Sequence, residues 1–147
     1  MARKARKIRQ YRQKGQSLIS ANKISLENWH LSDEEIRQAL KPLNITINKV
    51  KKIHYLKHQV CISWWDKQGN VCSSFFSYRI FARWQAEVER LINACHTLKK
   101  FYIIIGYIQY DVEHYPYPLE MSDAIAIARE NRECQLRAAA REAALAA

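Results

Sequence analysis

The sequence predicts an α+β protein, with a mainly antiparallel sheet packed by an amphipathic helix over residues 79–98. Three observations indicate this fold class. A capped helical segment at 32–40 precedes β-branched and partly alternating segments between 45 and 78. A strong apolar repeat of helical period follows them. The chain then ends in an alanine-rich segment with high helix propensity.

Length and composition fit one folded domain behind a basic segment. The 147 residues are 48% hydrophobic, with only three glycines and three prolines, so the chain has enough apolar surface for a core. We expect residues 1–16 to form a disordered basic arm, residues 17–121 an α+β core domain, and residues 122–147 a C-terminal alanine-rich helix. The expected order of elements is α-β-β-β-α-β-α.

The first helix has the clearest sequence signals of any element. Ser32 is an N-cap residue with Glu35 three positions later, the pattern of a capping box. Pro42 ends the helix near Leu40, because the residue before a proline disfavours helical geometry. We expect its inward side chains to be Ile36, Ala39 and Leu40.

Three strands should follow, at 45–57 and on both sides of a loop at 66–70. In the loop, Gly69 and Asn70 are able to take positive φ. If Asp66 lies opposite Val71, then Trp65 lies opposite Cys72 and Ile62 opposite Phe75. This register places Trp65 and Phe76 on one face of the sheet. If that face is open, the two rings form a surface patch.

The second half of the chain should hold helix 79–98, another strand and a last helix. Apolar residues recur at three and four positions from Ile80 to Leu98. Residues 101–112, FYIIIGYIQYDV, are apolar on both parities and predict a strand inside the sheet. Ser122 is expected to cap the final helix.

Positive charge is concentrated at the start of the chain. The formal net charge is +10, and residues 1–16 supply seven cations and no acid. Such a segment binds polyanions through counterion release without a folded pocket. The alternatives are a solubility tail and a targeting signal. The cations of the arm are Arg3, Lys4, Arg6, Lys7, Arg9, Arg12 and Lys14.

A second basic segment contains no acid between Ile36 and Trp65. Its lysines extend the path for a polyanion, or protect an edge strand against pairing. The candidate cations here are Lys49, Lys51, Lys52 and Lys57, with Arg79 and Arg83 at the start of the following helix. The aromatic candidates for base stacking or for a partner patch are Tyr11, Tyr55, Trp65 and Phe76.

These patterns predict a small nucleic-acid-binding accessory protein, with DNA and RNA both open. The alternative is a protein–protein adaptor or inhibitor. It would use an exposed aromatic sheet face or the C-terminal helix, with the basic arm docked on an acidic partner. Either way we expect no enzyme, because no nucleotide-binding, hydrolase or metalloprotease motif occurs. We therefore assign no catalytic residue, metal site or cofactor.

The surroundings of the protein can also be predicted. No apolar run reaches about 18 residues and no signal-peptide core follows the basic start, so we expect no membrane association and no secretion. The four cysteines contain no CxxC pair, which favours free thiols in a reducing cytoplasm.

Overall fold

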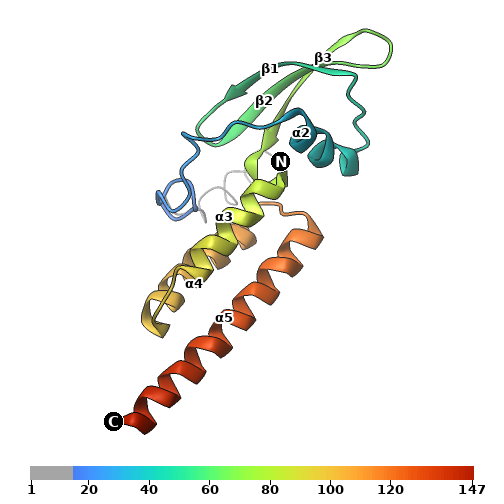
Figure 1. The fold of residues 1–147 in the computed structure, drawn as a ribbon. Coiled ribbons are helices and arrows are strands. Elements are labelled where there is room, and N and C mark those ends of the chain that lie inside the picture. Colours follow the sequence, from blue (N-terminus) through green and yellow to red (C-terminus); the bar gives the residue numbers. More distant parts are fainter. Residues whose placement is uncertain (1–14) are drawn as a thin grey trace, which may run out of the picture. The chain divides into compact units, whose positions relative to one another are not determined.

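The computed structural model describes residues 15–147, which combine a three-stranded sheet with helices (Figure 1). The α+β class is confirmed. The expected arm lies almost wholly outside the described residues. The elements are α2 (Asp33–Leu40), the 3₁₀ turn η1 (Lys41–Leu43), β1 (Lys49–Tyr55), β2 (Gln59–Trp65), β3 (Val71–Ser77), the 3₁₀ turn η2 (Tyr78–Ile80), α3 (Ala82–Asn93), α4 (Leu98–His114) and α5 (Leu119–Ala146).

The chain divides into two compact units. The first, which we call the sheet unit, is Ser25–Glu87. The second, the helical unit, is Val88–Ala147 together with the described residues up to Ile24. This division does not confirm the expected single core domain over 17–121.

Helix α2 forms as the sequence predicts. The Ser32 side chain accepts a hydrogen bond from the Glu35 amide, and the Glu35 carboxylate accepts one from the Ser32 amide, which completes the capping box. The α-helix ends at Leu40, and Pro42 lies in the 3₁₀ turn beyond it. Its buried side chains are those expected: Ile36, Ala39 and Leu40.

The sheet is antiparallel in the order β1-β2-β3, but its second hairpin closes one residue away from the expected register. Trp65 pairs with Val71, and Cys61 pairs with Phe75. The cause is the loop. Asp66 belongs to it, and its carboxylate accepts hydrogen bonds from the amides of Gln68 and Asn70. Since strand side chains alternate, this shift moves every β3 side chain to the face opposite the expected one.

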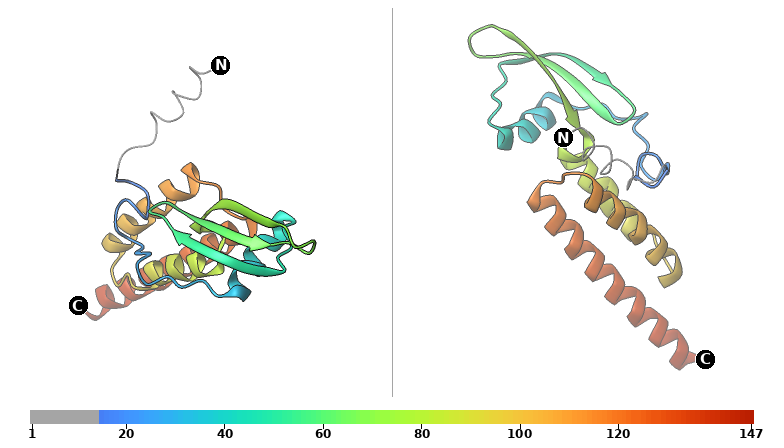
Figure 2. Two further views of the ribbon diagram at one scale, coloured as in Figure 1. Left: turned by 90° about the horizontal axis from the view of Figure 1, so that it is seen from above. Right: turned by 180° about the vertical axis from the view of Figure 1, so that it is seen from behind.

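Aromatic side chains dominate the core of the sheet unit. Trp29, from the segment before α2, makes edge-on contacts with Tyr78, Trp84 and Phe81 at centroid distances of 5.4, 6.4 and 6.5 Å. Figures 1 and 2 show α2 on one side of the sheet. The sheet side chains that complete this core are Val60, Ile62, Trp64 and Phe76.

Residues 101–112 are helical, so the expected fourth strand is wrong. They belong to α4, whose first turn is capped by the Thr97 hydroxyl accepting from the Lys100 amide. Within the long apolar run only every third or fourth side chain is buried, which is the spacing of one face of a helix. The buried positions are Phe101, Ile105, Ile108 and Asp111.

Helices α4 and α5 lie side by side in the helical unit (Figures 1 and 2). Helix α5 begins at Leu119, with Pro118 in the N-cap position, so the expected cap at Ser122 is wrong. Ser122 instead lies in the first turn, where its amide and hydroxyl both donate to the Pro118 carbonyl. The side chains of α5 that are buried are Met121, Ile125 and Leu136.

Asp111 is a fully buried carboxylate in α4. It accepts a hydrogen bond from the Leu18 amide at 3.1 Å and another from the Tyr117 hydroxyl. Because a buried carboxylate needs such donors, Asp111 ties both the turn near Leu18 and the segment after α4 to the helix.

Candidate nucleic-acid interface

One face of the sheet is open to solvent. In an antiparallel sheet, directly paired residues share a face and successive residues alternate between faces. The face opposite the buried Val60 and Ile62 holds twelve side chains, and we call it the open face. Eight of the twelve are exposed, and the other four are half-buried. The residues are Lys49, Lys51, Lys52, His54, Gln59, Cys61, Ser63, Trp65, Val71, Ser73, Phe75 and Ser77.

A β-bulge in β1 gathers three lysines on this face. Lys49 pairs with Trp65 and Lys52 pairs with Ser63, while the register shifts between Val50 and Lys52. Lys51 is the extra residue. Strict alternation would send either Lys51 or Lys52 to the buried face. The bulge instead lets both stand on the open side.

Lys51 and Trp65 are in contact across the strands. The Lys51 ammonium nitrogen lies 5.7 Å from the centroid of the Trp65 ring, within the range of a cation–π interaction. Trp29, Trp64 and Trp84 are buried, so Trp65, which is half-buried, is the only tryptophan that solvent reaches appreciably. A cation beside an accessible indole is the combination that a phosphate and its base can bind together.

Phe75 provides the second ring of the open face, and 58% of its surface is exposed. The pair Ser63–Ser73 lies between Phe75 and Trp65, with 3.2 Å between the two hydroxyl oxygens. The Cys61 sulfur lies 3.6 Å from the Ser73 hydroxyl. The floor between the two rings is therefore made of small polar side chains.

Charge on the sheet is one-sided. The lysines belong to β1, and β3 contains no charged residue. Asp66 is the only acid between Lys49 and Ser77. One oxygen of its carboxylate is held by the amides of Gln68 and Asn70 in its own loop, at 2.9 and 2.8 Å. An anion therefore meets positive charge along one edge of the open face.

The structure brings some of the predicted residues together and separates others. Lys49, Lys51 and Lys52 share the open face with Trp65. Lys57 is exposed in the turn between β1 and β2. This turn is held by Tyr78, whose hydroxyl donates to the Leu56 carbonyl at 2.6 Å. Burial, and secondarily the nearby Tyr55, raises the pKa of Tyr78 to about 12, so it stays a neutral donor.

The expected patch of Trp65 and Phe76 does not form. Phe76 is only 8% exposed and packs against Trp64, with 6.2 Å between ring centroids. Tyr55 pairs with Val60 on the inner face, and its hydroxyl accepts a hydrogen bond from the Leu31 amide. Tyr55 and Phe76 therefore do not line the open face.

The two arginines expected at the start of α3 are engaged within the sheet unit. Arg79 is 2% exposed, and its guanidinium lies 4.8 Å from the Trp84 ring centroid. Arg83 forms two hydrogen bonds to the Glu35 carboxylate, at 2.6 and 3.0 Å. We therefore remove both from the candidate interface. Tyr11 and the seven cations of the arm lie outside the described residues.

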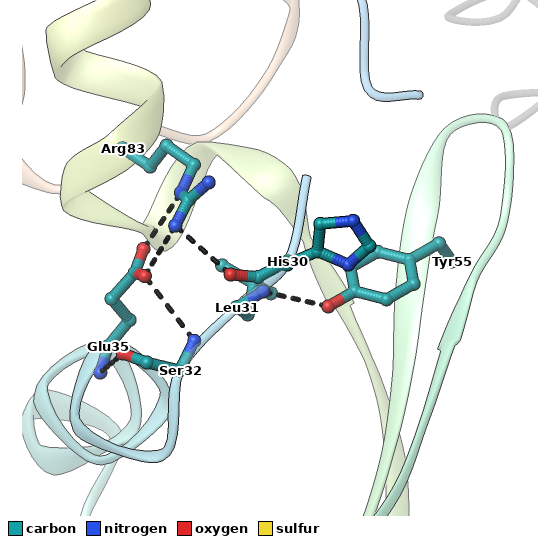
Figure 3. A network of polar contacts seen from close by, with 6 residues as sticks. All are labelled: His30, Leu31, Ser32, Glu35, Tyr55 and Arg83. Carbon is teal, nitrogen blue, oxygen red and sulfur yellow. Dashed lines mark hydrogen bonds and ion pairs between the residues drawn. The ribbon is translucent and has the colours of Figure 1, made fainter. Parts of the chain in front are cut away.

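Figure 3 shows the network that holds Arg83. The guanidinium also donates to the His30 carbonyl, so it joins α2 to the segment before it and to α3. The Arg83 guanidinium lowers the pKa of the Glu35 carboxyl, and Glu35 in turn raises the pKa of Arg83. This network supports the inner side of the sheet unit, away from the lysines.

Phe75 is the aromatic residue of the open face that the sequence analysis missed. The signal lay in the loop, because an aspartate that opens a short loop tends to accept hydrogen bonds from amides two residues on. Counting Asp66 as loop and not as strand gives the pairing of Trp65 with Val71. That register puts Phe75, and not Phe76, beside Cys61 on the open face.

Other kinds of site receive little support. Within residues 15–147, no group of three or more His, Cys, Asp or Glu side chains is placed to hold a metal ion. All four cysteines are free, as expected. Burial raises the pKa of the Cys95 thiol, whose sulfur donates to the Leu91 carbonyl. No helix in the described part of the chain is both long and apolar enough to cross a membrane.

Comparison with known proteins gives no relative. The chain matches no protein family, no curated protein and no solved structure. We therefore infer function from the residues of the open face and from the charge of the sequence.

Proposed function

We propose that this protein binds nucleic acid on the open face of its sheet, with the arm cations adding phosphate contacts. The observation that supports the proposal most is the cluster of Lys49, Lys51 and Lys52 on the same face as Trp65, the one tryptophan that is not buried. Ammonium groups neutralise phosphates, and an accessible indole stacks on a base whatever its identity.

The charge distribution favours a polyanion over a small anionic ligand. The lysines stand exposed along a strand, and Lys57 continues the basic edge at the other end of β1. The edge spans about 20 Å at about 3.3 Å per residue, the scale of several phosphates. Residues 1–16 add seven further cations without an acid. The opposing possibility is that the lysines only protect the edge strand from pairing.

The proposal is tested by measuring affinity against salt concentration. We compare the wild-type chain with Lys49→Ala/Lys51→Ala/Lys52→Ala and with a chain whose seven arm cations are replaced by glutamine. A matched control, Lys41→Ala/Lys99→Ala/Lys100→Ala, removes three exposed lysines that lie outside the open face. Each lost phosphate contact should reduce the slope of log K against log salt by about 0.7–0.9.

The two variant sets separate the contributions of the arm and the sheet. We expect the sheet triple variant to lower both the affinity and the slope, and the control to change neither by more than a general charge effect. Equal losses in the sheet variant and in the control would show that the open face binds nothing specifically. Unchanged binding after neutralisation of the arm would remove the arm from the proposal.

A further inference from the structure

We infer that the open face binds a single strand of nucleic acid and not a duplex. This inference rests on the proposed function and names the substrate class of the same site. In this arrangement the phosphate backbone follows β1, and the bases lie across β2 and β3 on Trp65 and Phe75. Three features of the open face support it.

The first feature is that charge lies on one edge alone. A sheet placed in the major groove of a duplex, which is about 12 Å wide, meets a phosphate backbone on each side. Here β1 carries the lysines, while β3 has no charged residue along Val71–Ser77. The edge at β3 would therefore face a row of phosphates with nothing to neutralise them. The phosphate backbone of a single strand that follows β1 places no phosphates beside the uncharged strand β3.

The second feature is the accessible pair of rings. Bases in a duplex are already stacked on each other, so their faces are closed to protein rings, whereas unpaired bases stack on aromatic side chains. Phe75 is 58% exposed, and Trp65 is half-buried beside Lys51. Phe75 pairs with Cys61, four residues from Trp65 along β2, so the two positions are about 13 Å apart along the strands. This spacing suits two separate bases better than one.

The third feature is the chemistry of the remaining side chains. Base pairs in the major groove are read chiefly by arginine or lysine on guanine and by asparagine or glutamine on adenine. The open face has no arginine or asparagine, and its one glutamine, Gln59, pairs with Ser77 at the end of the sheet far from Trp65. The surface between the rings consists of Ser63, Ser73 and Cys61, which leave room for flat bases.

The inference is tested with the full chain and three probes of equal length: oligo-dT, oligo-U and a mixed-sequence DNA duplex. Binding is measured at about 50 and 150 mM salt by anisotropy and by tryptophan fluorescence. Because Trp65 is the only tryptophan that is not buried, stacking on it should quench the emission. The variant Trp65→Phe should lose the quenching while it keeps a ring for stacking.

Variants of Phe75 test whether its ring stacks on a base. Phe75→Ala should weaken oligo-dT and oligo-U binding by about five-fold or more, as expected for one lost stacking contact. Phe75→Tyr keeps the ring and should retain affinity. The matched control Ile103→Ala removes an equally exposed apolar side chain from α4 and should have no effect. Phe75 is exposed, so these variants are expected to fold.

The outcomes distinguish this inference from the proposed function. At about 150 mM salt, single strands binding more tightly than the duplex, with loss in Phe75→Ala, would support the inference. The tighter of oligo-dT and oligo-U would then assign DNA or RNA. Equal or tighter duplex binding, or unchanged binding by Phe75→Ala, would overturn the inference and leave the proposed function standing. No binding of any probe at about 50 mM salt would overturn both.

Discussion

Phe75 and Phe76 are neighbours in β3 but belong to opposite faces of the sheet: Phe75 is 58% exposed on the open face, and Phe76 is 8% exposed in the core. This relationship depends on the hairpin register. The register decides which of the two rings is available to a ligand, because a shift of one residue exchanges the two faces of the strand.

The register has a direct consequence for stability. Phe76→Ala should lower the free energy of unfolding by about 3–5 kcal/mol, because it leaves a cavity beside Trp64. Phe75→Ala should change it by no more than about 0.5 kcal/mol, as is usual for an exposed site. Urea unfolding followed by circular dichroism measures both. The reverse order of the two effects would show that the hairpin closes with Asp66 opposite Val71.

The Glu35–Arg83 ion pair predicts a pH-dependent stability. The pKa of Glu35 is lower in the folded protein than its usual 4.5, chiefly because of the hydrogen bonds from Arg83. A lowered pKa means that the carboxylate stabilises the fold above pH about 4.5, and that this contribution is lost as the pH falls through the folded-state pKa. Glutamine can keep the capping box but not the ion pair.

We therefore expect Glu35→Gln to be less stable than wild type by about 1 kcal/mol at pH 7. The difference should shrink as the pH is lowered to about 3. Glu34→Gln is the matched control, since it removes a charge from the same helical turn but leaves the Arg83 pair intact. A stability difference between Glu35→Gln and wild type that stays constant from pH 7 to pH 3 would contradict the assigned role of the pair.

Two isoleucines distinguish the helix at Leu98–His114 from the strand that its composition suggests. Ile103 is 54% exposed and Ile105 is 5% exposed. In a strand the two would share a face. In the helix they point in different directions, so Ile105→Ala should cost about 2–5 kcal/mol and Ile103→Ala about 0.5 kcal/mol or less. Thermal unfolding of the two variants is the measurement, and similar losses would argue against α4.

Sequence signals were enough to predict the features that depend on interactions between neighbouring residues. The capping box at Ser32 and Glu35, the helix end before Pro42 and the positive φ of Gly69 all follow from the residues concerned and their nearest neighbours. Asn70, also considered for positive φ, does not adopt it. The basic strand and its exposed lysines could likewise be predicted, because a run of lysines in a β-forming segment cannot be buried without partners.

The sequence by itself determined the α+β class, the first helix, the three strands and the location of the positive charge. Tertiary structure decided the rest. The Phe101–Ile105–Ile108 stripe is buried in the helical unit, where α4 lies beside α5, so packing outweighed the β propensity of an isoleucine-rich run. The Asp66 loop chose the face of Phe75, and a bulge collected Lys51 with Lys52. Each of these features depends on contacts between segments that are distant in sequence, or on a shift of one residue in strand register. Composition and periodicity do not specify either.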